Sequence, residues 1–170
     1  MGIGLLTFIR HPVPQLIFAA FVVLSWPLSG LAGRDTHRRL AAAALVVSAG
    51  AIIALTATPS FADPATFAAN PPHFLTLLDR PGLLARQLVA PPSDLEQVAN
   101  IALYVPLGIS GAMLWRRWLP ATAFGFLLVL AIETVQYVIP GRAGSITDIR
   151  NNTLGALLGA VLTAVLRRRR

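Results

Sequence analysis

The chain has 170 residues, of which 55% are apolar and only 12% are charged, and its formal net charge is +7. A soluble domain usually carries about 25% charged residues, so this composition indicates a single membrane domain over residues 1–170. Because cysteine is absent, disulfides, a thiol nucleophile and cysteine metal sites are excluded. The basic residues are all arginines, mostly at the ends of apolar runs, and they form no basic face with interleaved aromatics, which argues against a nucleic-acid partner.

The sequence predicts an all-α fold, a polytopic membrane helix bundle with five transmembrane helices. Each span is an apolar run close to the length of about 20 residues that a helix needs to cross the hydrocarbon core. The expected spans are residues 13–32, 40–58, 98–115, 120–139 and 149–166. A cleaved signal peptide is the rival interpretation of the first run, but this run is longer than a usual signal-peptide core and its stronger positive flank follows it.

Residues 59–97 separate the second and third predicted spans and hold seven prolines. Because proline lacks a backbone N–H and stops helices, this segment is predicted to be a loop outside the bilayer core. Within it, the leucines of residues 73–90 favour a short helix that lies on the membrane surface and is interrupted at Pro81.

The arginines gather on one side of the membrane in this arrangement. The first short loop, the loop between the third and fourth spans and the C-terminal tail together carry nine of the 14 arginines. The positive-inside rule therefore predicts a cytoplasmic C-terminus, with the N-terminus and the loop 59–97 on the outside.

Polar side chains interrupt the apolar helices near the predicted outer surface. Glu133 lies about 10 Å below the end of the fourth span, at about 1.5 Å per residue, and Gln136 is one turn further on the same face. Such groups are costly in a membrane unless they pair or have a function, so they indicate a functional site. The predicted ligand-binding residues, which come from three helices and one turn and line a small pocket that opens outward, are Asn100, Tyr104, Glu133, Gln136, Arg142, Asp148 and Asn152.

Structural interpretations stand beside this functional one. Asp148 is also suited to cap the fifth helix or to lie in its first turn, where it interacts favourably with the helix dipole. Glu133 and Arg142 are also suited to a purely structural ion pair. Gly155 and Gly159 form a GxxxG pattern, which lets helices approach closely and would also suit an oligomer contact.

The second half of the chain, about residues 94–166, resembles the VanZ-like family of bacterial membrane proteins. Three blocks carry the resemblance: Asn100-Ile-Ala-Leu-Tyr-Val-Pro-Leu-Gly108, then Glu133-x-x-Gln136 followed by Pro140-Gly141-Arg142, then Asp148-x-x-x-Asn152-x-x-Gly155-x-x-x-Gly159. Residues 143–147 depart from the aromatic residue and the aspartate that usually precede the third block. The resemblance implies an integral protein of the bacterial plasma (inner) membrane, and the family's namesake is associated with resistance to the glycopeptide teicoplanin.

Two functions fit these observations. In the first, the pocket binds an amphiphilic or lipid-linked ligand, such as a membrane lipid head group, a glycopeptide or a cell-wall precursor. In the second, the protein is a membrane-embedded enzyme that acts on such a head group, with Glu133 and Asp148 as general acid and base or as metal ligands. No spacing typical of a nucleophile or metal site is evident, so no cofactor and no metal are expected. A transporter is disfavoured by five spans without an internal repeat.

Overall fold

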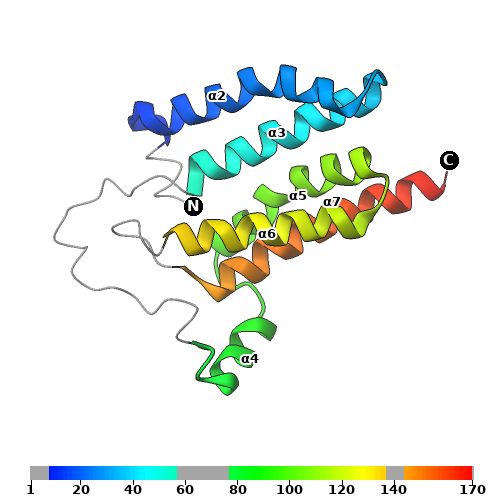
Figure 1. The fold of residues 1–170 in the computed structure, drawn as a ribbon. Helices are drawn as coiled ribbons and strands as arrows, with labels where there is room; N and C mark the ends of the chain where they lie inside the picture. The colour runs from blue at the N-terminus through cyan, green and yellow to red at the C-terminus, as the bar shows by residue number, and fades with distance from the viewer. Residues whose placement is uncertain (1–7, 57–76, 137–143, 170) are drawn as a thin grey trace.

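The computed structural model describes residues 8–56, 77–136 and 144–169, and these residues form helices and no strands. Five of the helices are long and apolar enough to cross a membrane, which confirms the predicted all-α membrane bundle (Figure 1). They are α2 (Pro12–Ser29), α3 (Thr36–Thr56), α5 (Leu95–Trp115), α6 (Trp118–Gln136) and α7 (Ile146–Arg168). A short 3-10 helix, η1 (Gly30–Ala32), extends α2, and a nine-residue helix, α4 (Pro81–Val89), precedes α5.

Two of the long helices begin in polar sequence, about three residues before the predicted spans. The Asp94 carboxylate accepts a hydrogen bond from the Gln97 amide at 2.9 Å and caps α5. The Ser145 hydroxyl accepts one from the Asp148 amide at 3.3 Å and caps α7. Because a cap satisfies amide groups that the first helical turn leaves without partners, the helices start in residues that an apolar run does not include.

The loop predicted over residues 59–97 is therefore too long at its C-terminal end, because residues 95–97 belong to α5. Residues 81–89 form a short helix in this segment, as expected, and Pro81 begins it rather than dividing it. Its position on the membrane surface stays a prediction. Residues 59–76, and the ends predicted for the second and fourth spans, lie outside the described residues.

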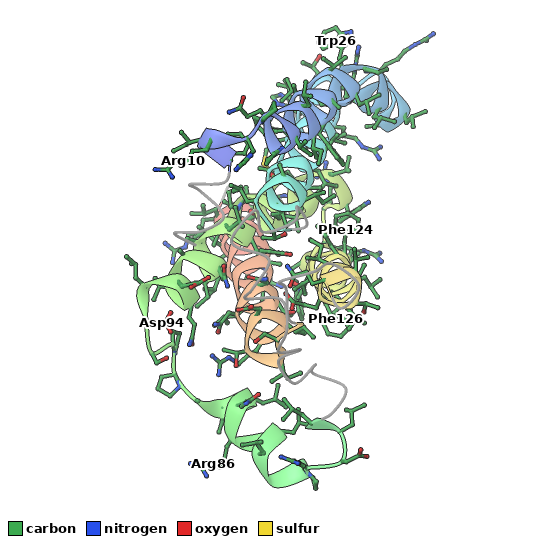
Figure 2. The ribbon with its side chains drawn as sticks, turned by 90° about the vertical axis from the view of Figure 1, so that its left-hand side faces the viewer. Arg10, Trp26, Arg86, Asp94, Phe124 and Phe126 are labelled. Carbon is green, nitrogen blue, oxygen red and sulfur yellow. The ribbon has the colours of Figure 1, made fainter. Side chains whose placement is uncertain are left out.

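The bundle has an inner and an outer part. The most extensive helix contact joins α5 to α7, with α6 packed on both and α3 packed on α5. By contrast, α2 packs mainly on α3. Trp26 lies at the outer edge of the bundle (Figure 2), where the Arg39 guanidinium of α3 stacks on its ring. Only 11% of the apolar stretch of α2 is buried, against 39% in α3 and in α7. The faces of α2 that no helix covers are apolar, as expected of a helix against lipid.

Glycines bring α5 and α7 into backbone contact. A Cβ atom at Gly155 would overlap the Ile101 carbonyl, and one at Gly159 would overlap the Val105 carbonyl. The close helix approach expected from the GxxxG pattern is thus present, but the partner is α5 of the same chain. This face of α7 is buried inside the bundle, so the two glycines pack within the chain. An oligomer contact through them stays a prediction that this packing does not support.

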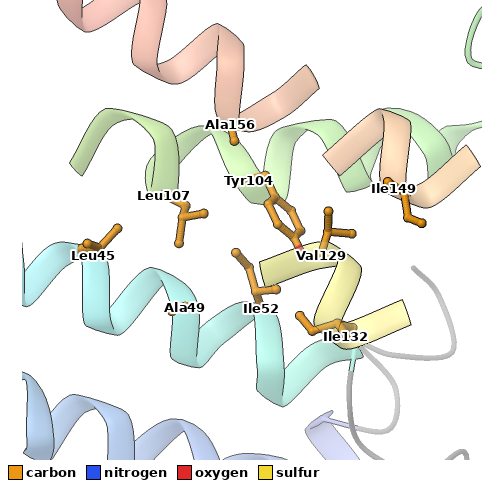
Figure 3. Packing of buried hydrophobic residues seen from close by; sticks show 9 residues of the cluster. All are labelled: Leu45, Ala49, Ile52, Tyr104, Leu107, Val129, Ile132, Ile149 and Ala156. Atoms are coloured by element: carbon orange, nitrogen blue, oxygen red, sulfur yellow. The ribbon is translucent and has the colours of Figure 1, made fainter. Parts of the chain in front are cut away.

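An apolar core fills the space between α3, α5, α6 and α7 (Figure 3). Its fully buried members include Ile52 of α3, Tyr104 and Leu107 of α5 and Val129 of α6. The Tyr104 ring extends from α5 towards Val129 (Figure 3), so a polar hydroxyl enters an otherwise apolar interior. This core holds α3, α5, α6 and α7 together and lies deeper in the bundle than the candidate site described next.

The two ends of the bundle differ in composition. One end, here called the arginine end, holds the connection from α2 to α3, the connection from α5 to α6 and the end of α7. Its described arginines are Arg34, Arg38, Arg39, Arg116, Arg117, Arg167, Arg168 and Arg169. The opposite end, here called the polar end, is where α3 and α6 finish and where α5 and α7 begin. It holds every described acidic residue except Asp35.

Candidate functional site

The first contact of the polar end joins α5 to α7. The Asn100 side-chain amide donates a hydrogen bond to a carboxylate oxygen of Asp148 at 2.9 Å. Both side chains are partly buried, and the close helix approach at Gly155 lies a few residues deeper. Ser145 caps α7, and Asp148 lies in the first turn of that helix. Asp148 is therefore not the cap, and its side chain pairs with a residue of another helix.

Glu133 attaches α6 to the start of α7. Its side chain is only 2% exposed, and the Ser145 backbone amide donates to one of its carboxylate oxygens at 2.7 Å. Ser145 therefore does two things: its hydroxyl caps α7, and its own N–H holds the carboxylate. A buried carboxylate needs such donors, because an unpaired charge in a low-dielectric interior is strongly disfavoured.

Gln136 connects α6 to α3. Its side-chain amide donates to the Thr56 carbonyl at 2.8 Å, and the side chain is buried. Thr56 is the last residue of α3, where helix carbonyls have no partner within their own helix. The i, i+3 pair on α6 thus faces inward as predicted, with Glu133 directed to α7 and Gln136 to α3.

Three buried polar atoms near these contacts have no hydrogen-bond partner within the described part of the chain. They are the Tyr104 hydroxyl, the Asn151 amide nitrogen and the Asn152 amide oxygen. An unsatisfied buried polar group costs about 1–3 kcal/mol, so these atoms offer hydrogen-bonding capacity that the fold does not use.

The structure also shows a contact that the sequence did not predict. The Arg150 guanidinium donates to the carbonyl of Gln87 at 2.5 Å and to that of Ala90, at the end of α4. It also donates to the side-chain oxygen of Asn151 at 2.8 Å. Arg150 thereby attaches the short helix α4 to the first turns of α7, beside the polar site.

The sequence contains a recognisable signal for the Ser145 cap but none for the contacts of Arg150 and Gln136. A serine three residues before an acidic residue, as in Ser145 and Asp148, is a helix-start pattern that identifies the cap. The partners of Arg150 and Gln136 are backbone carbonyls, which every residue carries, so residue types alone give no indication of those two contacts.

Five of the seven predicted ligand-binding residues lie at the polar end in the structure, and Tyr104 lies deeper, near the middle of α5. Asn100, Glu133, Gln136 and Asp148 make the contacts described above, and Tyr104 and Asn152 carry buried atoms without described partners. Arg142 lies outside the described residues, so its pairing with Glu133 stays a prediction. The pocket and the role of these residues as ligand contacts also stay predictions. Within residues 8–56, 77–136 and 144–169, no three histidine, cysteine, aspartate or glutamate side chains gather in a way that would hold a metal ion.

Five apolar helices around a buried polar cluster define the chain as a polytopic helical membrane protein. The family described as VanZ/LLP1 matches residues 15–167, and the chain belongs to this family. This match runs from the first span to the last, so it is wider than the resemblance over residues 94–166. The chain is similar to "Protein VanZ" of Enterococcus faecium, with 32% identity over 69 residues that cover 39% of this chain and 43% of that protein. No solved structure matches the chain.

Proposed function

We propose that this VanZ/LLP1 family member binds an amphiphilic or lipid-linked ligand of the bacterial cell envelope at its polar end. The arginine end then faces the cytoplasm of the plasma membrane together with the C-terminus, as the positive-inside rule requires. The polar end faces the outside, where lipid head groups and cell-wall precursors are exposed.

The observation that carries this proposal is the pair of unpartnered polar atoms on Tyr104 and Asn152. The Tyr104 hydroxyl can donate and accept, and the Asn152 amide oxygen can accept. Both are buried beside helices that already use their other polar side chains for contacts. A ligand group that supplies the missing partners gains hydrogen bonds in a low-dielectric site, where they are stronger than in water.

The chemistry of the site narrows the ligand class. The described polar groups are amides, a hydroxyl and two carboxylates, which suits a head group rich in hydroxyl and amide groups. The exposed leucines of α4, among them Leu83 and Leu88, suit an apolar tail lying at the membrane surface. Glycopeptides, lipid head groups and lipid-linked cell-wall precursors share this amphiphilic character, and the resemblance to the VanZ-like family adds teicoplanin as the first compound to test.

Substitution of Tyr104 by phenylalanine separates ligand binding from stability. Tyr104→Phe removes only the hydroxyl, which has no described partner, so the protein without ligand is expected to keep its thermal midpoint or to rise slightly. The apparent affinity of the variant for a stabilising amphiphile is expected to fall about tenfold. The measurement is a thermal shift of the purified protein in detergent with teicoplanin, lipid head groups and divalent metals.

A matched control for this experiment is Thr163→Val. It removes another buried hydroxyl, which donates to the Gly159 carbonyl in the half of α7 nearer the arginine end, and it is expected to leave ligand stabilisation unchanged. If Tyr104→Phe and Thr163→Val respond to every amphiphile as the wild type does, the polar cluster is structural and the proposal fails. Release of product from a head group, or stabilisation by metal alone, would instead indicate the enzyme alternative through Glu133 and Asp148.

Deletion and complementation test the same site in cells. Deleting the gene is expected to change teicoplanin susceptibility, and the wild-type gene is expected to restore it. Glu133→Gln keeps an oxygen that accepts the Ser145 amide but removes the charge, so it is expected to be produced normally and to fail in complementation. Normal complementation by Glu133→Gln and Arg142→Ala would assign these residues to the architecture alone.

A further inference from the structure

The arginine end contains a concave site that the proposed function does not use. A hollow of about 440 Å³ lies between the connection from α5 to α6 and the last turns of α7. Four arginines line it, namely Arg116, Arg117, Arg167 and Arg168. The volume is in the range of small-molecule sites, which hold about 300–1,000 Å³.

Among the residues that the structure describes, nothing neutralises the charge of this hollow. Among the described residues, no carboxylate pairs with any of its four guanidinium groups, and none lines the hollow. Asp35, the one acidic residue described at this end, accepts a hydrogen bond from the His37 backbone amide in the connection from α2 to α3. Four cations around one cavity repel each other, so an anion between them lowers the electrostatic energy of the folded protein.

The surroundings of the hollow indicate which anion fits. Trp118 and Leu119 line it and are 43% and 62% exposed, and Leu166 of α7 is exposed next to the lining arginines. Tryptophan beside arginine at the end of a membrane helix is typical of the level of lipid head groups. The planar guanidinium binds phosphate oxygens in pairs, and basic cavities between membrane helices are typical sites for anionic lipid head groups.

Arg116 adds a second, independent observation. It ends α5 in the left-handed conformation with φ of 58°, and no other non-glycine residue in the described part of the chain has a positive φ. Glycine usually holds this position at the end of a helix because a Cβ atom is disfavoured there, at a cost of about 1 kcal/mol. The chain therefore accepts local strain at the residue that places a fourth guanidinium at the hollow, as is common at functional sites.

We propose that this hollow binds the phosphate group of an anionic phospholipid from the leaflet at the arginine end. The four arginines contact the head group, and Trp118 and Leu119 contact the first atoms of the acyl chains. Arginines also act as topology signals, which require positive charge but no particular geometry. The two roles differ in one respect: lysine satisfies the topology signal, whereas it lacks the planar fork that binds phosphate oxygens in pairs.

Lipid titration of the purified protein tests the proposal. Phosphatidylglycerol added to the protein in detergent is expected to raise the thermal midpoint in a saturable way, and phosphatidylcholine is expected to have no comparable effect. Native mass spectrometry is expected to retain one tightly bound phosphatidylglycerol. Equal stabilisation by both lipids would overturn the proposal, and stabilisation by inorganic phosphate equal to that by phosphatidylglycerol would overturn the assignment to a lipid.

Two double variants separate the site from the topology signal. Arg117→Lys with Arg167→Lys keeps the charge and the insertion of the protein, and it is expected to weaken phosphatidylglycerol binding by about tenfold. Arg34→Lys with Arg38→Lys is the matched control at the same end of the bundle but outside the hollow, and it is expected to bind as the wild type does. If both double variants bind equally well, the arginines serve topology alone.

The strained residue gives the sharpest test. Arg116→Gly relieves the left-handed conformation and removes one guanidinium, so we expect a higher thermal midpoint without lipid together with weaker phosphatidylglycerol binding. A merely structural residue would move stability and apparent binding in the same direction. An Arg116→Gly protein that is less stable without lipid, or that binds phosphatidylglycerol as tightly as the wild type, would contradict the role assigned to Arg116.

Discussion

The two ends of this bundle handle charge in opposite ways. At the polar end, Glu133 is buried and held by a backbone amide, and Asp148 is held by Asn100 from another helix. At the arginine end, Arg116, Arg117 and their neighbours are exposed and form no described ion pairs. A buried charge needs partners fixed by the fold, whereas an exposed cation is hydrated and stays available to bind an anion. The fold therefore fixes Glu133 and Asp148 in place, whereas the arginines at the other end keep their charge available.

The largest expected effect removes the packing that holds the polar end together. Gly155→Ala places a Cβ atom against the Ile101 carbonyl, which forces α5 and α7 apart and is expected to cost about 3 kcal/mol of unfolding free energy. Gly30→Ala is the same chemical change where nothing lies within 4 Å, and it is expected to be neutral. The free energy of unfolding in mixed micelles measures both, and equal effects would show that α5 and α7 do not pack as described.

The contact between Asn100 and Asp148 is expected to be weaker than the helix packing but specific. A double-mutant cycle with Asn100→Ala and Asp148→Ala should give a coupling energy of about 1 kcal/mol, which is usual for hydrogen bonds between membrane helices. The pair Asn100→Ala and Ser48→Ala is the control, because the Ser48 hydroxyl bonds within α3 and distant sites add independently. Unfolding free energies of the single and double variants measure this coupling, and a value near zero would mean that the two side chains do not interact.

Loss of the cap at Ser145 tests whether the helix start supports the polar end. Ser145→Ala removes the hydroxyl that accepts the Asp148 amide and is expected to cost about 1 kcal/mol, while the backbone amide that holds Glu133 remains. Thermal unfolding in detergent detects this loss. Ser145→Thr keeps the hydroxyl and should retain most of the stability, and an equal loss in both variants would attribute the effect to packing instead.

The attachment of α4 should affect local motion more than global stability. Arg150→Ala removes the donor to the carbonyls of Gln87 and Ala90, so hydrogen–deuterium exchange in residues 81–90 is expected to accelerate while α5 and α7 keep their protection. Arg80→Ala removes an exposed arginine that precedes the same helix and should leave exchange unchanged. Unaltered exchange in Arg150→Ala would show that α4 does not depend on this contact.

The smallest expected effect is a pH dependence at the cap of α5. The Gln97 backbone amide, with smaller contributions from the Ser93 and Gln97 side chains, lowers the pKa of the exposed Asp94 carboxylate below its usual range. A lowered pKa means that Asp94 stabilises the folded protein above about pH 4 and that this contribution is lost as the pH falls further. Asp94→Asn should weaken the change of the thermal midpoint between pH 6 and pH 3. An unchanged pH profile in that variant would assign the dependence to other groups.

The general architecture followed from the sequence because hydropathy is a one-dimensional property. Apolar runs gave the number and order of the spans, and the direction of each span placed Asn100, Glu133 and Asp148 at one end. The helix starts were less accessible, since caps such as Asp94 and Ser145 are polar and fall outside an apolar run. The contacts of Arg150 and Gln136, and the partner of the Gly155 face, depend on which helices pack together, which no local pattern encodes.

The orientation of the two ends can be measured directly, because the chain has no cysteine of its own. Two exposed positions suit single cysteines. Gly82 in α4 lies at the polar end, and Arg169 after α7 lies at the arginine end. A membrane-impermeant maleimide applied to intact cells or spheroplasts should label Gly82→Cys at once and Arg169→Cys only after lysis. Labelling of Arg169→Cys in unbroken cells, with Gly82→Cys protected, would contradict an outward-facing polar site.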